Sequence, residues 1–309
     1  MRPAWIPVTL FGLALCLAGP AWAGPGTSGA QVLRQPLSAR TQGFAGAGSA
    51  WVRDVHALAS NPAGLAGLET ADVTFLHATG LEGMDTEWLA GAVPVAGLGT
   101  IAAQVLYRGA PDIDNLGADE PAVTVRDMVF GASFAREWAP GVRAGLNAKV
   151  LWLTLGPAEA SALSVDLGVQ ADVTPDVWVV GAALRNLGTG VAYLEVEDPQ
   201  PLTFAAGTAY RVLASDPHAI TAMLDVEHVA PESQTLVRVG AEYRFQRQIA
   251  FRAGHEIAAR RTVNGPAFGV GFLFTAGPVD FRIDFAVRPQ VWQDEDFELA
   301  NLLNLSAAF

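Results

Sequence analysis

The stretch SALSVDLGVQADV, Ser161–Val173, alternates between apolar side chains and polar or small ones. Its apolar members are Leu163, Val165, Leu167, Val169, Ala171 and Val173. Because successive side chains of a β-strand point to opposite faces of the sheet, this pattern predicts a strand with one apolar and one polar face. The same alternation at Thr235–Gln246 and Pro278–Arg288 predicts two more strands of this kind.

The alternation extends from about residue 71 to the last residue and predicts fourteen strands. Their ranges are 73–79, 86–95, 98–109, 125–136, 141–154, 161–173, 176–187, 201–212, 217–228, 235–246, 248–259, 266–275, 278–288 and 296–309. Most approach the roughly 9–11 residues that a tilted strand needs to cross a bilayer. Long and short connections alternate, as in outer-membrane barrels, whose periplasmic turns are short. The sequence therefore predicts an all-β, transmembrane antiparallel β-barrel over 71–309.

The composition of the 309 residues agrees with this prediction. With 51% hydrophobic and 16% charged residues, the chain is too apolar to be disordered and unusually apolar for a soluble protein. Beyond the N-terminal segment, Gly, Pro and polar residues interrupt the apolar runs, which argues against a helical membrane bundle. The net charge of −12 argues against a nucleic-acid partner, since phosphate binding needs clustered Lys and Arg.

The first 23 residues have the pattern of a secretory signal peptide. Arg2 precedes an apolar stretch over Trp5–Leu17, and the small residues at 21–23 suit cleavage after Ala23. A lipoprotein signal ending at Cys16 is disfavoured because bulky Leu15 stands before the cysteine. We therefore expect export to the outer membrane of a Gram-negative-type bacterium.

The last predicted strand ends on an aromatic residue, Phe309. Bacterial outer-membrane barrels commonly end in such a strand, which the barrel-assembly machinery reads. The sequence thus predicts that machinery and outer-membrane lipid as partners. The alternative, a secreted β-sandwich or periplasmic β-protein, would hide its apolar faces between sheets.

Residues 24–70 precede the barrel and predict an N-terminal arm and a small hatch. Residues 24–43 are expected to be extended, and 45–60 to form a short helix capped by Ser49. Asn61-Pro62 ends this helix, because a residue before proline is pushed out of the helical region.

The glycine-rich GFAGAGSA, Gly43–Ala50, followed by Asp54 and by NPAGL, Asn61–Leu65, carries a family resemblance. It resembles the N-terminal signature of PorV/PorQ-type outer-membrane proteins and of the broader FadL-like transporter superfamily. The resemblance implies a fourteen-stranded barrel with an N-terminal hatch in the lumen. It assigns the gating turn to Asn61, Pro62, Ala63 and Gly64. The alternative is an ordinary turn that stops a helix.

Charged side chains at the strand positions that alternate with the apolar ones, and so face the lumen, form a predicted lumen ladder. If 246–248 is a turn, Arg238 faces Glu256 and Glu242 faces Arg252. The ladder comprises Asp225, Arg238, Glu242, Arg252, Glu256, Asp280, Arg282 and Asp284. Opposite charges on facing strands stabilise each other, which favours a structural ladder filling a narrow lumen. The alternative is a charged conduction path.

Two further features concern the barrel wall. Pro94 donates no ladder hydrogen bond, so it marks either a wall interruption or a strand end near the periplasmic rim. Tryptophans near segment ends predict an interfacial girdle. They are Trp88, Trp138, Trp152, Trp178 and Trp292.

The sequence predicts neither an enzyme nor a cofactor or metal. The acidic loops at 112–120, 195–198 and 294–298 lack the spacing of a calcium loop and are expected to be solvated. His228 near Ser233 is the least poor candidate for a hydrolase pair, without any serine motif around it.

Two hypotheses for function follow. In the first, the chain resembles PorV/PorQ-type proteins and is a non-catalytic component of protein export or surface attachment that contacts secreted cargo. In the second, it resembles FadL-like channels and passes small hydrophobic molecules across the outer membrane. Short loops and modest length favour the first, whereas Pro94 and the apolar segment Gly43–Leu68 permit the second.

Overall fold

The computed structural model describes residues 27–80, 83–110, 123–258, 265–291 and 297–309. The predicted signal peptide, Trp292 and the acidic loop 112–120 lie outside these residues, as does 294–296 of the last acidic loop. Among the described residues, no helix has the length and apolar character needed to span a bilayer.

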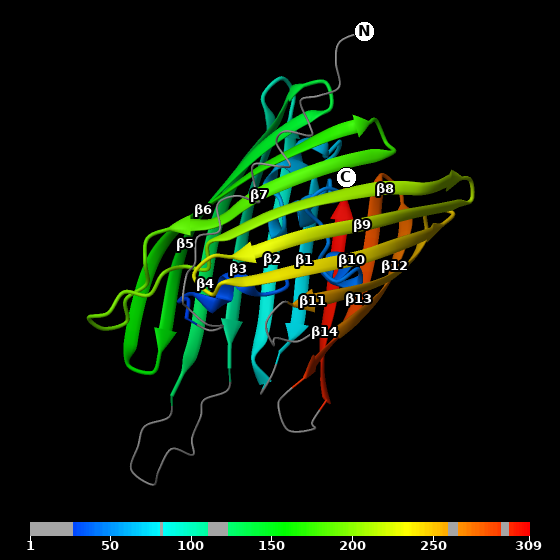
Figure 1. Ribbon diagram of the computed structural model, residues 1–309. Coiled ribbons are helices and arrows are strands. Elements are labelled where there is room, and N and C mark those ends of the chain that lie inside the picture. Colours follow the sequence, from blue (N-terminus) through cyan, green and yellow to red (C-terminus); the bar gives the residue numbers. More distant parts are fainter. Residues whose placement is uncertain (1–26, 81–82, 111–122, 259–264, 292–296) are drawn as a thin grey trace.

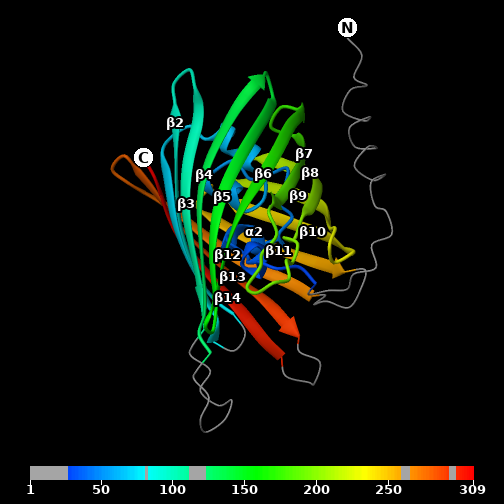
Figure 2. The same cartoon turned by 90° about the vertical axis from the view of Figure 1, so that its left-hand side faces the viewer.

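Fourteen antiparallel strands close into a barrel, which confirms the predicted fold class (Figures 1 and 2). Each strand pairs with its neighbours in sequence, and β1 pairs with β14 to complete the ring. The strands are β1 Asp72–Thr79, β2 Asp85–Val95, β3 Gly99–Gly109, β4 Val125–Ala139, β5 Val142–Leu155, β6 Ala158–Thr174, β7 Trp178–Gly188, β8 Thr203–Ser215, β9 His218–Val229, β10 Gln234–Phe245, β11 Ile249–Ala258, β12 Gly265–Ala276, β13 Val279–Val291 and β14 Phe297–Ala308.

The two faces of the wall are the reverse of those of a soluble sheet. In β6 the outward Leu163 and Val169 are 57% and 52% exposed, whereas the inward Asp166 and Gln170 are buried. Lipid would cover the outer face of such a wall, so apolar side chains belong there and polar ones in the lumen. This arrangement explains how a chain so rich in hydrophobic residues can have a polar interior.

The tryptophan prediction is correct in part. Trp138, Trp152 and Trp178 are exposed on the barrel exterior. Trp88 is fully buried, and its indole Nε1 donates to Gln104 Oε1 at 2.8 Å, so its assignment to the girdle is wrong. Trp88 lies two residues before buried Ala90 in β2, so its side chain points to the same inner face of the strand. It therefore belongs to the lumen core and not to an interface.

The connections give the barrel two different ends. Those after the even-numbered strands are tight turns, such as the one between β10 and β11, and we call this end the short-turn end. The connections after odd-numbered strands at the opposite, long-loop end include the stretch between β7 and β8. In outer-membrane barrels the end with short turns faces the periplasm.

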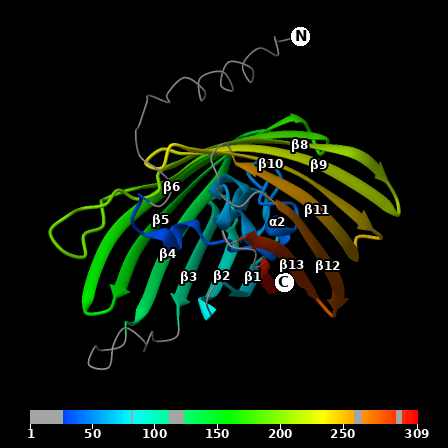
Figure 3. The same cartoon turned by 60° about the horizontal axis from the view of Figure 1, so that its bottom comes forward.

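The N-terminal segment lies in the lumen as an arm followed by a hatch (Figure 3). The arm, residues 27–37, contains η1 Gln31–Arg34. The hatch, residues 38–68, contains α2 Ala39–Gly43, η2 Val55–Ala59 and η3 Pro62–Gly67. Phe44, Val52 and Leu65 of the hatch are fully buried in one apolar cluster with wall residues such as Leu76 and Trp88.

The helix predicted over 45–60 is found only at Val55–Ala59, as the 3₁₀ helix η2. The extended conformation predicted for 24–43 is wrong where the described residues form η1 and α2. The α-helix begins earlier, after Ser38, whose side chain accepts from Thr41 N. No helix begins at Ser49: its backbone N–H donates to Asp225 on the wall at 2.9 Å, and the next helix, η2, is capped by Asp54. Asn61 caps the start of η3 instead of merely ending a helix, with Pro62 in the first helical position.

Candidate functional site

The Asn61 turn is bound to the wall of the barrel. Asn61 is fully buried, and its Nδ2 donates to Ser49 O at 2.8 Å and to Val169 O of β6 at 3.0 Å. Its Oδ1 accepts from Ala63 N at 3.1 Å. The four predicted gating residues, Asn61–Gly64, are therefore buried in one turn that is held against the inner wall.

Glycines on the inner wall make room for this turn. Gly145 of β5 and Gly168 of β6 are partners in the ladder. A Cβ on Gly145 would lie 2.4 Å from the carbonyl carbon of Pro62, and one on Gly168 would lie 1.9 Å from Asn61 Oδ1. The hatch backbone thus lies directly on the strand backbone, where no side chain would fit.

A second pair of wall glycines accommodates the start of the hatch. Gly240 of β10 and Gly254 of β11 are also ladder partners, and both lie against Phe44. A Cβ on either would come within 2.6 Å of a Phe44 atom. The wall therefore fits the hatch closely on two arcs, β5–β6 and β10–β11.

Ion pairs fasten the hatch near the short-turn end. Asp54 accepts from Arg40 of α2 and from Arg282 of β13, the latter at 2.8 Å. Arg282 also pairs with Asp72, the first residue of β1. Arg53 of the hatch pairs with Asp172 of β6. We call Arg40, Asp54, Asp72 and Arg282 the Asp54 cluster.

Two buried titratable groups of the hatch have pKa values below their ordinary range. Burial raises the pKa of Asp54, but the Arg40 and Arg282 guanidiniums outweigh this and hold it well below its ordinary range. Burial lowers the pKa of His56 to about 4, and the charge of Asp54 offsets this only in part. The docked hatch therefore holds His56 neutral and Asp54 ionised at neutral pH.

Acidification is expected to loosen the hatch. Once undocked, His56 regains its ordinary pKa near 6.5 and takes up a proton that the docked form binds only near pH 4. Docking should therefore weaken by roughly 3 kcal/mol as the pH falls across this window. Asp54 adds to the loss at still lower pH, because its docked pKa is also depressed.

Hydrogen exchange of residues 55–65 between pH 7.5 and 4.5 measures this effect. His56→Asn should remove most of the pH dependence, whereas His77→Asn, which changes a half-exposed histidine on β1, should leave it unchanged. Equal protection at both pH values in the unmodified protein would contradict the assignment.

The register of the ladder is the one expected from a turn at 246–248. Arg238 lies opposite Glu256, and Glu242 opposite Arg252. Arg238 donates to Glu256 at 2.7 Å, and Arg252 donates to Glu242 at 2.8 Å and to Asp284 at 2.6 Å.

Three ladder residues have other roles. Asp225 lies opposite Arg238 in register, but its carboxylate accepts from the hatch at Ser49 N. Arg282 belongs to the Asp54 cluster. Asp280 lies at the rim, where Thr275 donates to it at 2.6 Å. These three side chains therefore do not form one continuous row with the others.

The ladder also includes Glu227 and Arg185, which the sequence analysis did not select. Glu227 accepts from Arg185 and, at 2.6 Å, from Arg238. Glu256 also accepts from Arg288. The result is a chain of alternating charges, Arg185–Glu227–Arg238–Glu256–Arg288, that begins and ends on arginine.

A cavity of about 570 Å³ lies in the long-loop half of the lumen, between the arm, the hatch and the wall. The arm residues 31–37 form one side of it, and Leu58–Ser60 of the hatch contribute to its base. Gly29 N donates to Pro199 O at 2.9 Å, and Arg34 pairs with Glu232 at 2.6 Å, so the arm is bound to the outer loops. The cavity is thus separated from the short-turn end by the hatch.

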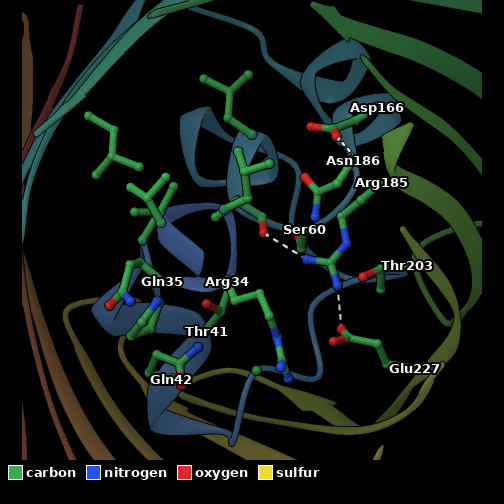
Figure 4. Close-up of a pocket in the computed structure, with 18 of the residues that line it drawn as sticks. Arg34, Gln35, Thr41, Gln42, Ser60, Asp166, Arg185, Asn186, Thr203 and Glu227 are labelled. Atoms are coloured by element: carbon green, nitrogen blue, oxygen red, sulfur yellow. Dashed lines mark hydrogen bonds and ion pairs between the residues drawn. The ribbon is translucent and has the colours of Figure 1, made fainter. Parts of the chain in front are cut away.

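The lining of the cavity is apolar on one arc and polar on another. Leu106 of β3, Val129 of β4 and Leu302 of β14 supply apolar surface. Polar groups gather on the opposite arc (Figure 4). They are Asp166, Arg185, Asn186, Thr203 and Glu227. These charges are paired, Asp166 with Lys149 at 2.7 Å and Arg185 with Glu227, so the polar arc carries compensated charge.

Pro94 lies at the penultimate position of β2, opposite Thr100 and beside the turn to β3. The ladder between β2 and β3 continues from there to Asp85 and Gly109. This position corresponds to the strand end at the rim rather than to an interruption in the middle of the wall.

His228 lies against Thr235. Its Nδ1 lies 3.0 Å from Thr235 Oγ1 on the neighbouring strand.

Comparison with known proteins identifies the fold. No protein-family model matches the sequence, and no curated protein matches it. The toluene transporter TbuX of Ralstonia pickettii is 14% identical with a TM-score of 0.60, over 87% of this chain and 96% of that one. The toluene transporter TodX of Pseudomonas putida is 12% identical with a TM-score of 0.58, over 93% and 98%. A FadL homologue of Pseudomonas aeruginosa is 13% identical with a TM-score of 0.53, over 89% and 98%. At these identities the likeness shows the fold alone: this chain has the barrel fold of FadL-like outer-membrane transporters.

Proposed function

We propose that this protein is a non-catalytic channel that admits small, largely apolar molecules through the outer membrane of a Gram-negative-type bacterium. The cavity above the hatch is the observation that carries the proposal. It is large enough for a small organic molecule, and it has an apolar arc formed by Leu106, Val129 and Leu302. Similar structures include transporters of toluene, which makes monoaromatic hydrocarbons the first solutes to test.

The structural comparisons favour this hypothesis over a role in protein export or surface attachment. The export role rests on the resemblance to PorV/PorQ-type proteins, whereas the similar solved structures include toluene transporters. The cavity adds a place for a solute inside the lumen, whereas cargo contact would need a surface on the outer loops.

We also propose that β14 directs assembly into the membrane. Phe309 exchanges both backbone hydrogen bonds with Ala71 at the start of the barrel, and its side chain is 63% exposed at the short-turn end. An exposed terminal aromatic residue on the strand that closes the ring is accessible to the assembly machinery before closure.

A matched pair of valine substitutions tests the channel function. Val129→Trp should fill the cavity and lower toluene entry into proteoliposomes about tenfold, because the indole would occupy the space a solute needs. Val105→Trp changes an outward-facing valine on the neighbouring β3 and should leave entry unchanged. Entry measured with a radiolabelled solute gives the readout. Identical rates for the two variants would mean that the cavity is not on the path.

A further inference from the structure

A second, smaller pocket lies at the short-turn end, on the other side of the hatch from the cavity. Its volume is about 110 Å³. It is formed by the inner surfaces of β10–β13, the turn at 246–248 and α2 of the hatch. It does not share lining residues with the large cavity.

The pocket is basic in a chain whose net charge is −12. Its charged lining residues are Arg40, Arg244, Arg247, Arg252, Arg282, Glu242 and Asp284. Asp54 and Asp72, beside the pocket, pair with Arg40 and Arg282, so among the described residues four carboxylates oppose the five guanidiniums. One positive charge is left in excess, which a bound anion would offset.

The two carboxylates are already shared among several arginines. Glu242 accepts from Arg244 at 2.6 Å through one oxygen and from Arg252 at 2.8 Å through the other. Arg40 Nε lies 3.6 Å from the second oxygen, which is too far for a hydrogen bond. Asp284 accepts from Arg252 at 2.6 Å.

Several donors around the pocket are not used. Within the part of the chain that the structure describes, Arg40 Nε and Arg282 Nε are buried without a hydrogen-bond acceptor. Among the same residues Arg247 makes no ion pair, and its side chain is exposed in the turn between β10 and β11. Arg244, whose side chain is 36% exposed, lies beside it at the mouth of the pocket.

We propose that this pocket binds a small oxyanion, a phosphate or a carboxylate, that enters from the periplasmic side. Guanidinium groups match both anions through paired N–H donors. A water molecule takes about 30 Å³ of liquid volume, so the pocket holds an oxyanion with few waters and excludes a bulky apolar solute. Arg244 and Arg247 are the groups that an incoming anion meets first.

The bound anion would join the hatch to the wall. Arg40 belongs to α2 of the hatch, whereas Arg244, Arg252 and Arg282 belong to wall strands. An oxyanion held between them would accept hydrogen bonds from both sides. Because the anion would bind the docked hatch and not the undocked one, its binding stabilises the docked state.

Calorimetric titration of the purified full barrel, in a detergent without phosphate groups, tests the proposal. Inorganic phosphate and acetate are titrated in separate arms at ionic strength matched with sodium chloride. Saturable binding of either anion is expected, and the arm that binds identifies the preferred oxyanion. The absence of saturable heat in both arms would overturn the proposal.

Two variants locate the binding to this pocket. Arg244→Gln with Arg247→Gln should weaken the affinity about tenfold or more, because charge-assisted hydrogen bonds are lost. Arg136→Gln removes an exposed arginine near the short-turn end of β4 and should leave the affinity unchanged. Heat-modifiable migration on a detergent gel verifies that both variants are folded.

The coupling to the hatch has its own readout. Saturating phosphate or acetate, whichever binds, should slow hydrogen exchange of α2 and η2 in the unmodified protein but not in the double variant. Equal affinity in the double variant and in the unmodified protein would place the anion elsewhere and overturn the assignment. Because this test measures anion binding rather than solute entry, it is independent of the proposed channel function.

Discussion

Deletion of residues 31–67 should turn the barrel into an open pore and raise its single-channel conductance about tenfold or more. The segment extends through the lumen from the arm near the long-loop end to the Asp54 cluster near the short-turn end. A fourteen-stranded barrel is wider than the eight-stranded barrels whose side chains fill the interior by themselves. Removal of the insert should therefore leave a continuous aqueous path.

Planar-bilayer recording of the deletion variant beside the full chain gives the measurement. Heat-modifiable migration serves as the folding control, because the gel band of a closed barrel changes position when the sample is boiled. Unchanged conductance in a variant that still shifts would show that the charged ladder alone closes the lumen.

Gly145→Ala should displace the hatch while leaving the barrel closed. The new Cβ would lie 2.4–2.6 Å from backbone atoms of Pro62 and Ala63, which cannot rotate away as a side-chain end could. Such overpacking should cost the docked hatch about 3 kcal/mol. We expect faster proteolysis of residues 38–68 and more frequent channel openings.

A second glycine provides the matched control for this variant. A Cβ on Gly91 of β2 would meet its nearest neighbouring atom, Asp72 O, only at 4.0 Å, so Gly91→Ala should leave hatch protection unchanged. Equal protease sensitivity of the Gly145 and Gly91 variants would mean that the turn does not lie against β5 in solution.

The strands of this protein could be predicted from the sequence because each has two faces in different surroundings. Leu163 and Asp166 of β6 belong to opposite faces, and alternation along the chain is enough to reveal both. The pairing of Arg238 with Glu256 followed from the same logic, since a tight turn at 246–248 fixes the register on either side of it.

The path of the hatch could not be predicted in the same way. Ser49 looks like a helix cap in the sequence, yet its N–H donates to Asp225, 176 residues away. Local propensity carries no information about such a partner. The cavity was missed for the same reason, because its surfaces come from the arm, the hatch and wall strands that are distant in sequence.

Two residues that were not placed correctly could have been placed from the sequence. Glu227 is two residues after Asp225 and so faces the lumen as Asp225 does. Trp88 is two residues before buried Ala90 and so faces inward too. Arg185 was harder to place, because Asn186 has a φ of 61° and the pairing of β6 with β7 shifts there. A shift of this kind breaks the alternation on which the prediction depends.

The wall glycines have a consequence for related chains. At Gly145, Gly168, Gly240 and Gly254, atoms of the hatch occupy the space that a side chain would need. In a barrel of this fold without an N-terminal insert, bare backbone at these points would leave voids, so larger residues should stand there. Glycines at inward positions on paired neighbouring strands would then reveal an internal plug from the barrel sequence alone, even in a fragment that lacks its N-terminus.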